Sequence, residues 1–195
     1  MEGDRGDVPA ARELFSQALA ANKALEEESG IALVLNNSAE LEFADGHLEQ
    51  AVRAASEALE IQLRAKRAKD IAVSSTNIVA YRIALGELTG ARDLAREGLR
   101  VARQGRFELL IAIALQHLAV IAGLGGDARC GAQLLGYVDV QYAALGTQRE
   151  PTEQWGYDKL VAELCQTLSA DEIATLRAEG AAWSEDRAVE EALKV

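Results

Sequence analysis

The sequence predicts an all-α fold, a solenoid of stacked helix pairs, and two observations lead to this prediction. Good helix formers dominate the composition, and Pro9 and Pro151 are the only prolines, so the strongest helix breaker is missing from the chain between them. A 40-residue repeat is marked by four glycines, Gly6, Gly46, Gly86 and Gly126. A fixed period between about 20 and 50 residues is typical of stacked repeats, in which neighbouring units share one core.

Small and apolar residues recur in register with the four repeat glycines. The fifth residue after each glycine is very small: Ala11, Ala51, Ala91 and Gly131. The eighth residue is apolar: Leu14, Ala54, Leu94 and Leu134. A small side chain lets two helix backbones approach closely, so we expect the first of these columns at the contact between paired helices.

Each repeat glycine separates two helical patterns. Asp7 as an N-cap and Pro9 in the first turn predict a helix over 8–28, whose pair partner would precede residue 1. We therefore expect the chain to begin in the middle of a repeat unit. Apolar residues at three- and four-residue steps predict further helices, in order, near 31–44, from Leu48 through Ile61, and near 70–85, 88–104, 107–123 and 127–145.

The 40-residue pattern ends after Gly146, and the chain that follows is different. Residues 147–151 form a connector without apolar periodicity, and a helix is expected over 152–168. A capping box then predicts a helix over 170–179 that stops at Gly180, and a final short helix ends at Leu193. We divide the chain into repeats over 1–146 and capping helices over 147–195, which cover one open end of the solenoid.

Charge and composition limit the classes of partner. The net charge of -11 and a sequence pI near 4.7 argue against direct nucleic-acid binding, which requires clustered lysine and arginine. No apolar run is long enough for a membrane span, and the N-terminus does not resemble a signal peptide. Cys130 and Cys165 are expected to be small buried apolar residues in a reducing compartment. A cytoplasmic protein is expected.

Two segments, Leu35–Gly46 and Leu115–Asp127, resemble tetratricopeptide repeats in the lengthened form found in large bacterial signal-transducing ATPases, transcriptional regulators and cyclases. Four segments of the tail are similar to the C-terminal ends of such proteins: 132–136, 142–146, 178–183 and 188–193. The resemblance implies a right-handed solenoid of about three and a half repeats. It also implies a non-enzymatic protein-interaction or docking module at the C-terminal end of a regulator.

Two polar columns mark a candidate partner-binding groove. They lie ten and nine residues before the repeat glycines: Asn36, Thr76 and Gln116, then Asn37, Asn77 and His117. In tetratricopeptide arrays this part of the first helix tends to face the concave groove, where amides and hydroxyls can bind a peptide backbone. Glu40 would add a negative charge to that face. The alternative is that these residues form inter-helix hydrogen bonds or face water.

The sequence contains no motif for catalysis or cofactor binding. His47 and His117 are 70 residues apart and have no ligand partner at a suitable spacing, so no metal site is expected. The expected partner is a protein or peptide. A second hypothesis is a ligand-sensing module, whose enclosed apolar pocket binds a small molecule or short peptide and controls an attached domain.

The helix over 8–28 has more apolar positions than one neighbouring helix can cover. Leu14 and Phe15 belong to this face, and a homodimer through them is one expectation. The alternative is that residues 1–8 fray and the helix tilts to hide Phe15 within its own chain.

Overall fold

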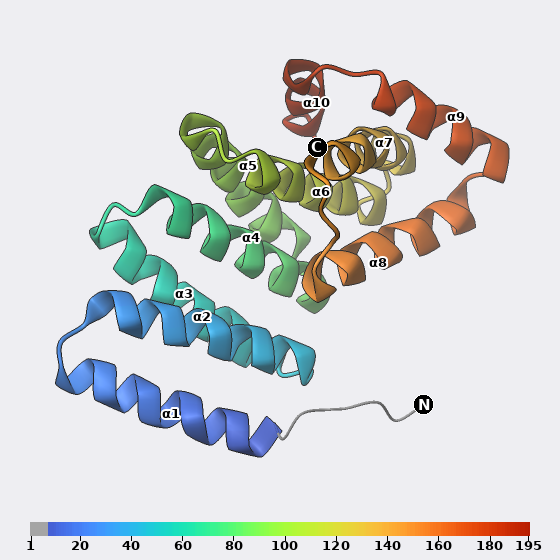
Figure 1. Cartoon of the computed structure of the whole chain (residues 1–195). Helices are drawn as coiled ribbons and strands as arrows, with labels where there is room; N and C mark the ends of the chain where they lie inside the picture. The colour runs from blue at the N-terminus through green and yellow to red at the C-terminus, as the bar shows by residue number, and fades with distance from the viewer. Residues whose placement is uncertain (1–7) are drawn as a thin grey trace.

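The computed structural model describes residues 8–195, and this part of the chain is an all-α solenoid without strands (Figure 1). Its helices are α1 Val8–Ala24, α2 Glu28–Ala44, α3 Leu48–Arg64, α4 Ala68–Leu85, α5 Leu88–Gly105, α6 Glu108–Leu124, α7 Ala128–Leu145, α8 Pro151–Thr167, α9 Ala170–Ala181 and α10 Glu185–Ala192. The helices from α1 to α7 pack one against the next along the molecule. None of the helices in the described range is long and apolar enough to cross a membrane. Gly6 and the expected N-cap Asp7 lie outside the described residues.

The turns of the solenoid repeat every 20 residues, which is half the period of the sequence pattern. A residue with positive φ ends each of the helices from α1 to α7: Glu26, Gly46, Lys66, Gly86, Arg106, Gly126 and Gly146. Each turn is closed by the same pair of backbone hydrogen bonds, as from His47 N–H to Glu42 O at 2.8 Å and from Gly46 N–H to Phe43 O at 3.1 Å. The turns within a repeat use glycine, as does the turn at Gly146 that follows the last repeat. The turns between repeats use larger residues in the same conformation.

The left-handed turn at Glu26 corrects one expected boundary. The sequence predicted a helix over 8–28 and a second helix from residue 31. The first helix ends at Ala24 instead, and α2 already begins at Glu28. The expectation was wrong because a glutamate does not reveal by its residue type that its backbone is in the left-handed conformation, whereas a glycine suggests it.

The column of very small residues lies at helix–helix contacts. Ala51 and Ala91 are fully buried, and Gly131 is buried as well. A Cβ at Gly131 would lie only 3.0 Å from the backbone oxygen of Ala119 on α6. These positions confirm that the small residues allow close approach of neighbouring helices.

Enlarging Ala51 or Ala91 to leucine should overpack these contacts. We expect Ala51→Leu and Ala91→Leu each to lower the free energy of unfolding by about 1–3 kcal/mol. Ala20→Leu, on the exposed side of α1, is the matched control and should change it by less than about 0.5 kcal/mol. Urea unfolding midpoints measure the difference, and midpoints equal to that of the control would contradict the packing.

The C-terminal helices do not continue the solenoid in the same arrangement. Helix α8 packs mainly along α6, while α9 packs on α7 and makes few contacts with α8 (Figure 1). Helix α10 lies near α6 and α7, and Arg103 on α5 pairs with Glu185 at 3.1 Å and with Asp186 at 2.6 Å. With neighbours on nearly every side, α6 forms the centre of the core, and its residues 110–123 are all buried.

The caps of α9 and α10 are those that the sequence predicts, but Gly180 has a different role from the predicted one. Ser169 and Glu172 form the predicted capping box, and Ser184 accepts a hydrogen bond from the backbone of Arg187. Gly180 was expected to stop its helix. It lies inside α9 instead, because it provides the space for a close crossing with α7.

Candidate functional site

Three neighbouring cavities run along the face formed by α2, α4 and α6, and together we call them the groove. The connector cavity, about 420 Å³, lies between α4, the start of α6 and residues 147–150. The α8 cavity, about 630 Å³, lies beside the first turn of α8 and shares Glu40, Asn77, Glu150 and Glu153 with the connector cavity. The α2 cavity, about 350 Å³, lies between α2 and α4 and shares Glu40 with both. Glu40 is therefore at the centre of the groove.

Five of the seven candidate residues lie in the groove. Asn36 and Asn37 line the α2 cavity, Thr76 lines the connector cavity, and Glu40 and Asn77 lie where cavities meet. Asn77 Nδ2 donates a hydrogen bond to Glu40 Oε1 at 3.3 Å. The structure thus brings together residues from two successive repeats.

Four of these five side chains form hydrogen bonds within the solenoid, because Asn36 and Thr76 also have partners besides the Asn77–Glu40 pair. Asn36 Nδ2 donates to Ser74 Oγ at 2.9 Å, and the Ser74 hydroxyl donates back to Asn36 Oδ1 at 3.0 Å. The Thr76 hydroxyl donates to Val73 O at 2.7 Å. For Asn36, and for Asn77 with Glu40, the inter-helix alternative describes the structure. Asn37 is exposed, and Asn77 is half-buried.

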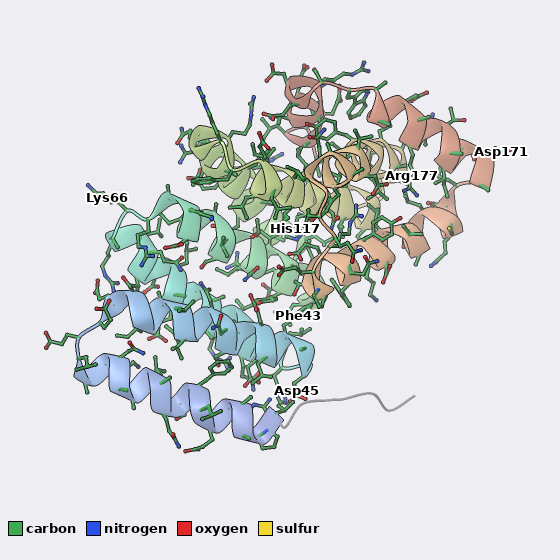
Figure 2. All side chains as sticks on the ribbon, in the orientation of Figure 1. Phe43, Asp45, Lys66, His117, Asp171 and Arg177 are labelled. Atoms are coloured by element: carbon green, nitrogen blue, oxygen red, sulfur yellow. The ribbon has the colours of Figure 1, made fainter. Side chains whose placement is uncertain are left out.

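Gln116 and His117 do not face the groove, which corrects their expected placement. Helix α8 covers α6 at this point, and Gln116 Nε2 donates to Glu153 O at 2.8 Å. His117 lies in the interior of the molecule, and neither of its ring nitrogens has a hydrogen-bond partner (Figure 2). Burial lowers the pKa of His117 to about 4, so its ring is neutral at physiological pH. The repeat pattern could not show these positions to be covered, because α8 lies outside it.

Arg149 in the connector holds the start of α8 against the solenoid. Its Nε donates to Gln116 Oε1 and its Nη2 to Asp139 Oδ1, both at 2.6 Å. The guanidinium also lies 4.5 Å from the ring centre of Tyr142 and 4.3 Å from that of Tyr157. Sequence reasoning missed this residue, because a polar connector without periodicity gives no signal of a buried role.

Three carboxylates from α2, the connector and α8 line the groove together. Glu153 is only 6% exposed, and its pKa is raised to about 7, mainly by burial and in smaller part by the charges of Glu150 and Glu40. Burial also raises the pKa of Glu40, with a further contribution from Glu150. Within residues 8–195, no group of three or more metal-ligating side chains is arranged to hold an ion. The three carboxylates give this part of the groove a negative electrostatic potential when they are ionised.

Replacing Glu153 by glutamine should change how stability depends on pH. The folded state keeps the Glu153 proton up to about pH 7, whereas the unfolded chain loses it near 4.5, so the stabilisation from this proton is lost as pH rises between these values. Glutamine mimics the protonated form. We expect Glu153→Gln to be more stable than wild type at pH 8 by up to about 3 kcal/mol and equal to it at pH 4.5.

Urea unfolding at both pH values measures this difference. His117 has the opposite pH dependence, since its contribution is lost as pH falls from 6.5 towards 4, but it is present in both proteins and cancels. If the stability of the two proteins changed equally with pH, the raised pKa of Glu153 would be contradicted.

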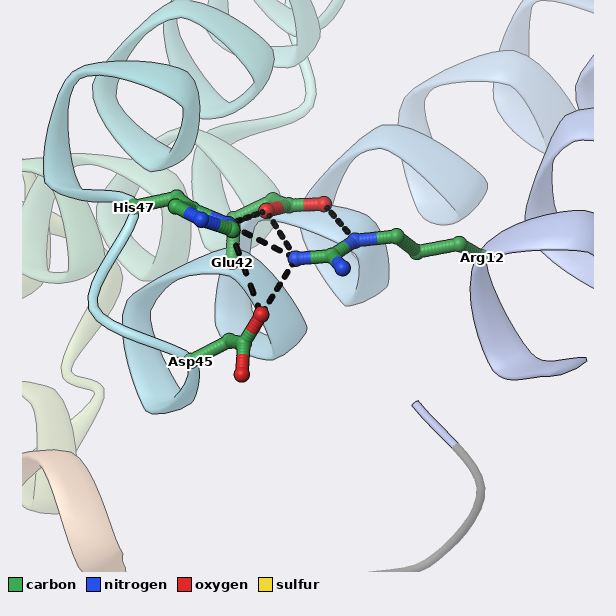
Figure 3. Close-up of polar contacts among 4 residues, drawn as sticks. All are labelled: Arg12, Glu42, Asp45 and His47. Carbon is green, nitrogen blue, oxygen red and sulfur yellow. Dashed lines mark hydrogen bonds and ion pairs between the residues drawn. The ribbon is translucent and has the colours of Figure 1, made fainter. Parts of the chain in front are cut away.

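A polar network whose residues line none of the three cavities joins α1 to the turn between α2 and α3 (Figure 3). Arg12 Nε donates to Glu42 Oε1 at 2.8 Å, and its Nη2 donates to Asp45 Oδ2 at 2.6 Å. His47 Nδ1 lies 2.8 Å from Glu42 Oε2. The hydrogen bond from Arg12 is the main cause of the lowered pKa of Glu42. Helix α1 has no buried residue, so this network and the packing of the partly buried Leu19 attach it to the solenoid.

The apolar face of α1 remains open in the single chain. Leu14 is 64% exposed, and Phe15 is half-buried rather than hidden.

Of the two cysteines, Cys130 is half-buried and Cys165 is exposed, so the expectation of two buried thiols was wrong. Burial raises the pKa of the Cys130 thiol to about 11, which leaves it protonated.

Comparison with protein-family models, curated proteins and solved structures finds no match to this chain.

Proposed function

We propose that this chain is a non-enzymatic interaction module that binds a peptide segment of a partner protein in the groove. One observation carries the proposal: three cavities that meet at Glu40 form a continuous surface, with lining side chains from α2, α4, α6 and the connector. Exposed amides such as Asn37 can pair with a peptide backbone. The resemblance to tetratricopeptide regions of bacterial regulators supports a docking role in the cytoplasm.

The ligand-sensing hypothesis is the second candidate, and one feature favours it. The connector cavity is partly closed by residues 147–150 and has apolar walls that include Val73, Leu110 and Ile113. Its volume lies within the range of about 300–1,000 Å³ that is typical of small-molecule pockets. In this case a small molecule alone would occupy the cavity, and the rest of the groove would be unused.

A random peptide library displayed on phage tests the proposal directly. We expect selected peptides to bind the wild-type chain and to lose about tenfold or more in affinity for the double variant Asn37→Ala with Asn77→Ala, because two hydrogen-bonding amides are removed. Circular dichroism should show unchanged helicity.

The matched control for this variant is Gln50→Ala with Gln104→Ala, two exposed amides on α3 and α5 that line none of the three cavities. It should bind the selected peptides as wild type does. Equal losses in both double variants, or peptides that bind elsewhere, would contradict a peptide site in the groove.

A further inference from the structure

The connector cavity has an unbalanced set of charges. Four carboxylate side chains line it: Glu40, Glu108, Glu150 and Glu153. Lys69 is the one cationic side chain in its lining. The cavity is therefore suited to a positively charged group.

None of these four carboxylates forms an ion pair with a cationic side chain in the described part of the chain. Arg149 is close in sequence, but its guanidinium is held by Asp139 and Gln116. Glu40 and Glu150 are exposed at the rim, whereas Glu153 is buried. A buried carboxylate is normally paired, so the position of Glu153 is costly without a ligand.

Tyr142 provides an independent observation on the same cavity. It lines the wall opposite α4 and is only 4% exposed, yet its hydroxyl has no hydrogen-bond partner. Buried polar atoms are nearly always hydrogen-bonded in folded proteins. A phenol oxygen can accept a hydrogen bond from an ammonium or guanidinium group, so a cationic ligand would satisfy both Tyr142 and the carboxylates.

We propose that the connector cavity binds the positively charged side chain of an arginine or lysine in the partner peptide, an inference that rests on the proposed function. The charged end of that side chain would lie between Glu40, Glu153 and the Tyr142 hydroxyl. Its methylene groups would pack on the apolar wall formed by Val73, Leu110 and Ile113. The selected peptides should then share one essential basic residue.

Acetylarginine amide is the probe that tests this chemistry, and acetylcitrulline amide is its neutral isostere. Methyl NMR of Val73, Leu110 and Ile113 follows binding at the cavity wall. We expect saturable shifts with the arginine compound and binding weaker by at least about tenfold with the citrulline compound, because a charge-assisted contact is lost. Equal binding of the two compounds, or shifts spread over the acidic surface, would overturn the proposal.

Variants locate the effect within the cavity. Glu153→Gln and Tyr142→Phe should each weaken binding of acetylarginine amide, whereas Glu163→Gln, on α8 but outside the cavities of the groove, should not. Two further outcomes separate this inference from the proposed function. Selected peptides that bind the groove without an essential basic residue would refute the inference alone. Binding of acetylarginine amide without selection of any peptide would refute the peptide function while leaving the cationic site.

Discussion

Replacing Gly180 by alanine is expected to separate α9 from α7 and to lower the free energy of unfolding by at least about 3 kcal/mol. A Cβ at this position would lie 1.7 Å from the backbone oxygen of Gln133 on α7. The contact is reciprocal, since a Cβ at Gly136 would lie 2.0 Å from the backbone oxygen of Arg177 on α9. Backbone on both sides cannot move aside as a flexible side chain can, so we expect a similar loss for Gly136→Ala.

Gly156→Ala is the matched control for this prediction. Gly156 lies inside α8 and is buried, but a Cβ there would make an ordinary contact of 3.7 Å with Val120. Because alanine is the better helix former, we expect this variant to gain about 0.5–1 kcal/mol. The only two tryptophans are Trp155 in α8 and Trp183 between α9 and α10, so fluorescence during urea unfolding reports on this region. Equal midpoints for Gly180→Ala and Gly156→Ala would contradict the close crossing.

Removing the side chain of Arg149 is expected to have the second large effect. Arg149→Leu leaves the buried Gln116 without its donor, removes one of the two arginines on Asp139 and abolishes the contacts with Tyr142 and Tyr157. We expect a loss of about 2–4 kcal/mol. Arg149→Lys should recover only part of it, because an ammonium group cannot reproduce the planar, multiply bonded guanidinium.

Arg129→Leu is the control for this loss. Arg129 is exposed, and its single ion pair with Glu172 has a length of 4.0 Å. Removing it should change the free energy of unfolding by less than about 0.5 kcal/mol. Thermal and urea unfolding of all three variants give the comparison, and equal effects of Arg149→Leu and Arg129→Leu would show that the connector is not held as described.

The repeat pattern predicted the solenoid because helix contacts within it are local. Glycine at the turns and small residues such as Ala51 recur at a fixed spacing, which is directly visible in the sequence. The turns at Glu26, Lys66 and Arg106 leave none, since the same conformation is reached by ordinary polar residues. The 20-residue period therefore became visible only in the structure.

The path of α8 could not be read from the repeats, because it depends on contacts between distant segments. One signal was present: the sequence of α6 is apolar around its whole circumference, which is typical of a helix buried on all sides. This pattern predicts that His117 is buried rather than in the groove, and that a further helix covers α6.

The candidate site could be predicted only in part, because only some of its residues lie on the repeats. Glu40 and Asn77 lie on the repeats, where periodicity places them on a shared face. Glu150, Glu153 and Tyr142 enter the site from the connector, α8 and the end of α7. Their register relative to the repeats is set by packing such as that of Arg149, which has no period.

Hydrogen–deuterium exchange with a peptide selected from the library tests the central claim most directly, because it reports where the partner binds. We expect protection on binding to be confined to the groove: residues 29–40 of α2, 69–77 of α4, 107–113 at the start of α6, and the connector with the first turn of α8, 147–153. Protection confined instead to α1 or to the second helices α3 and α5, with exchange in the groove unchanged, would contradict it.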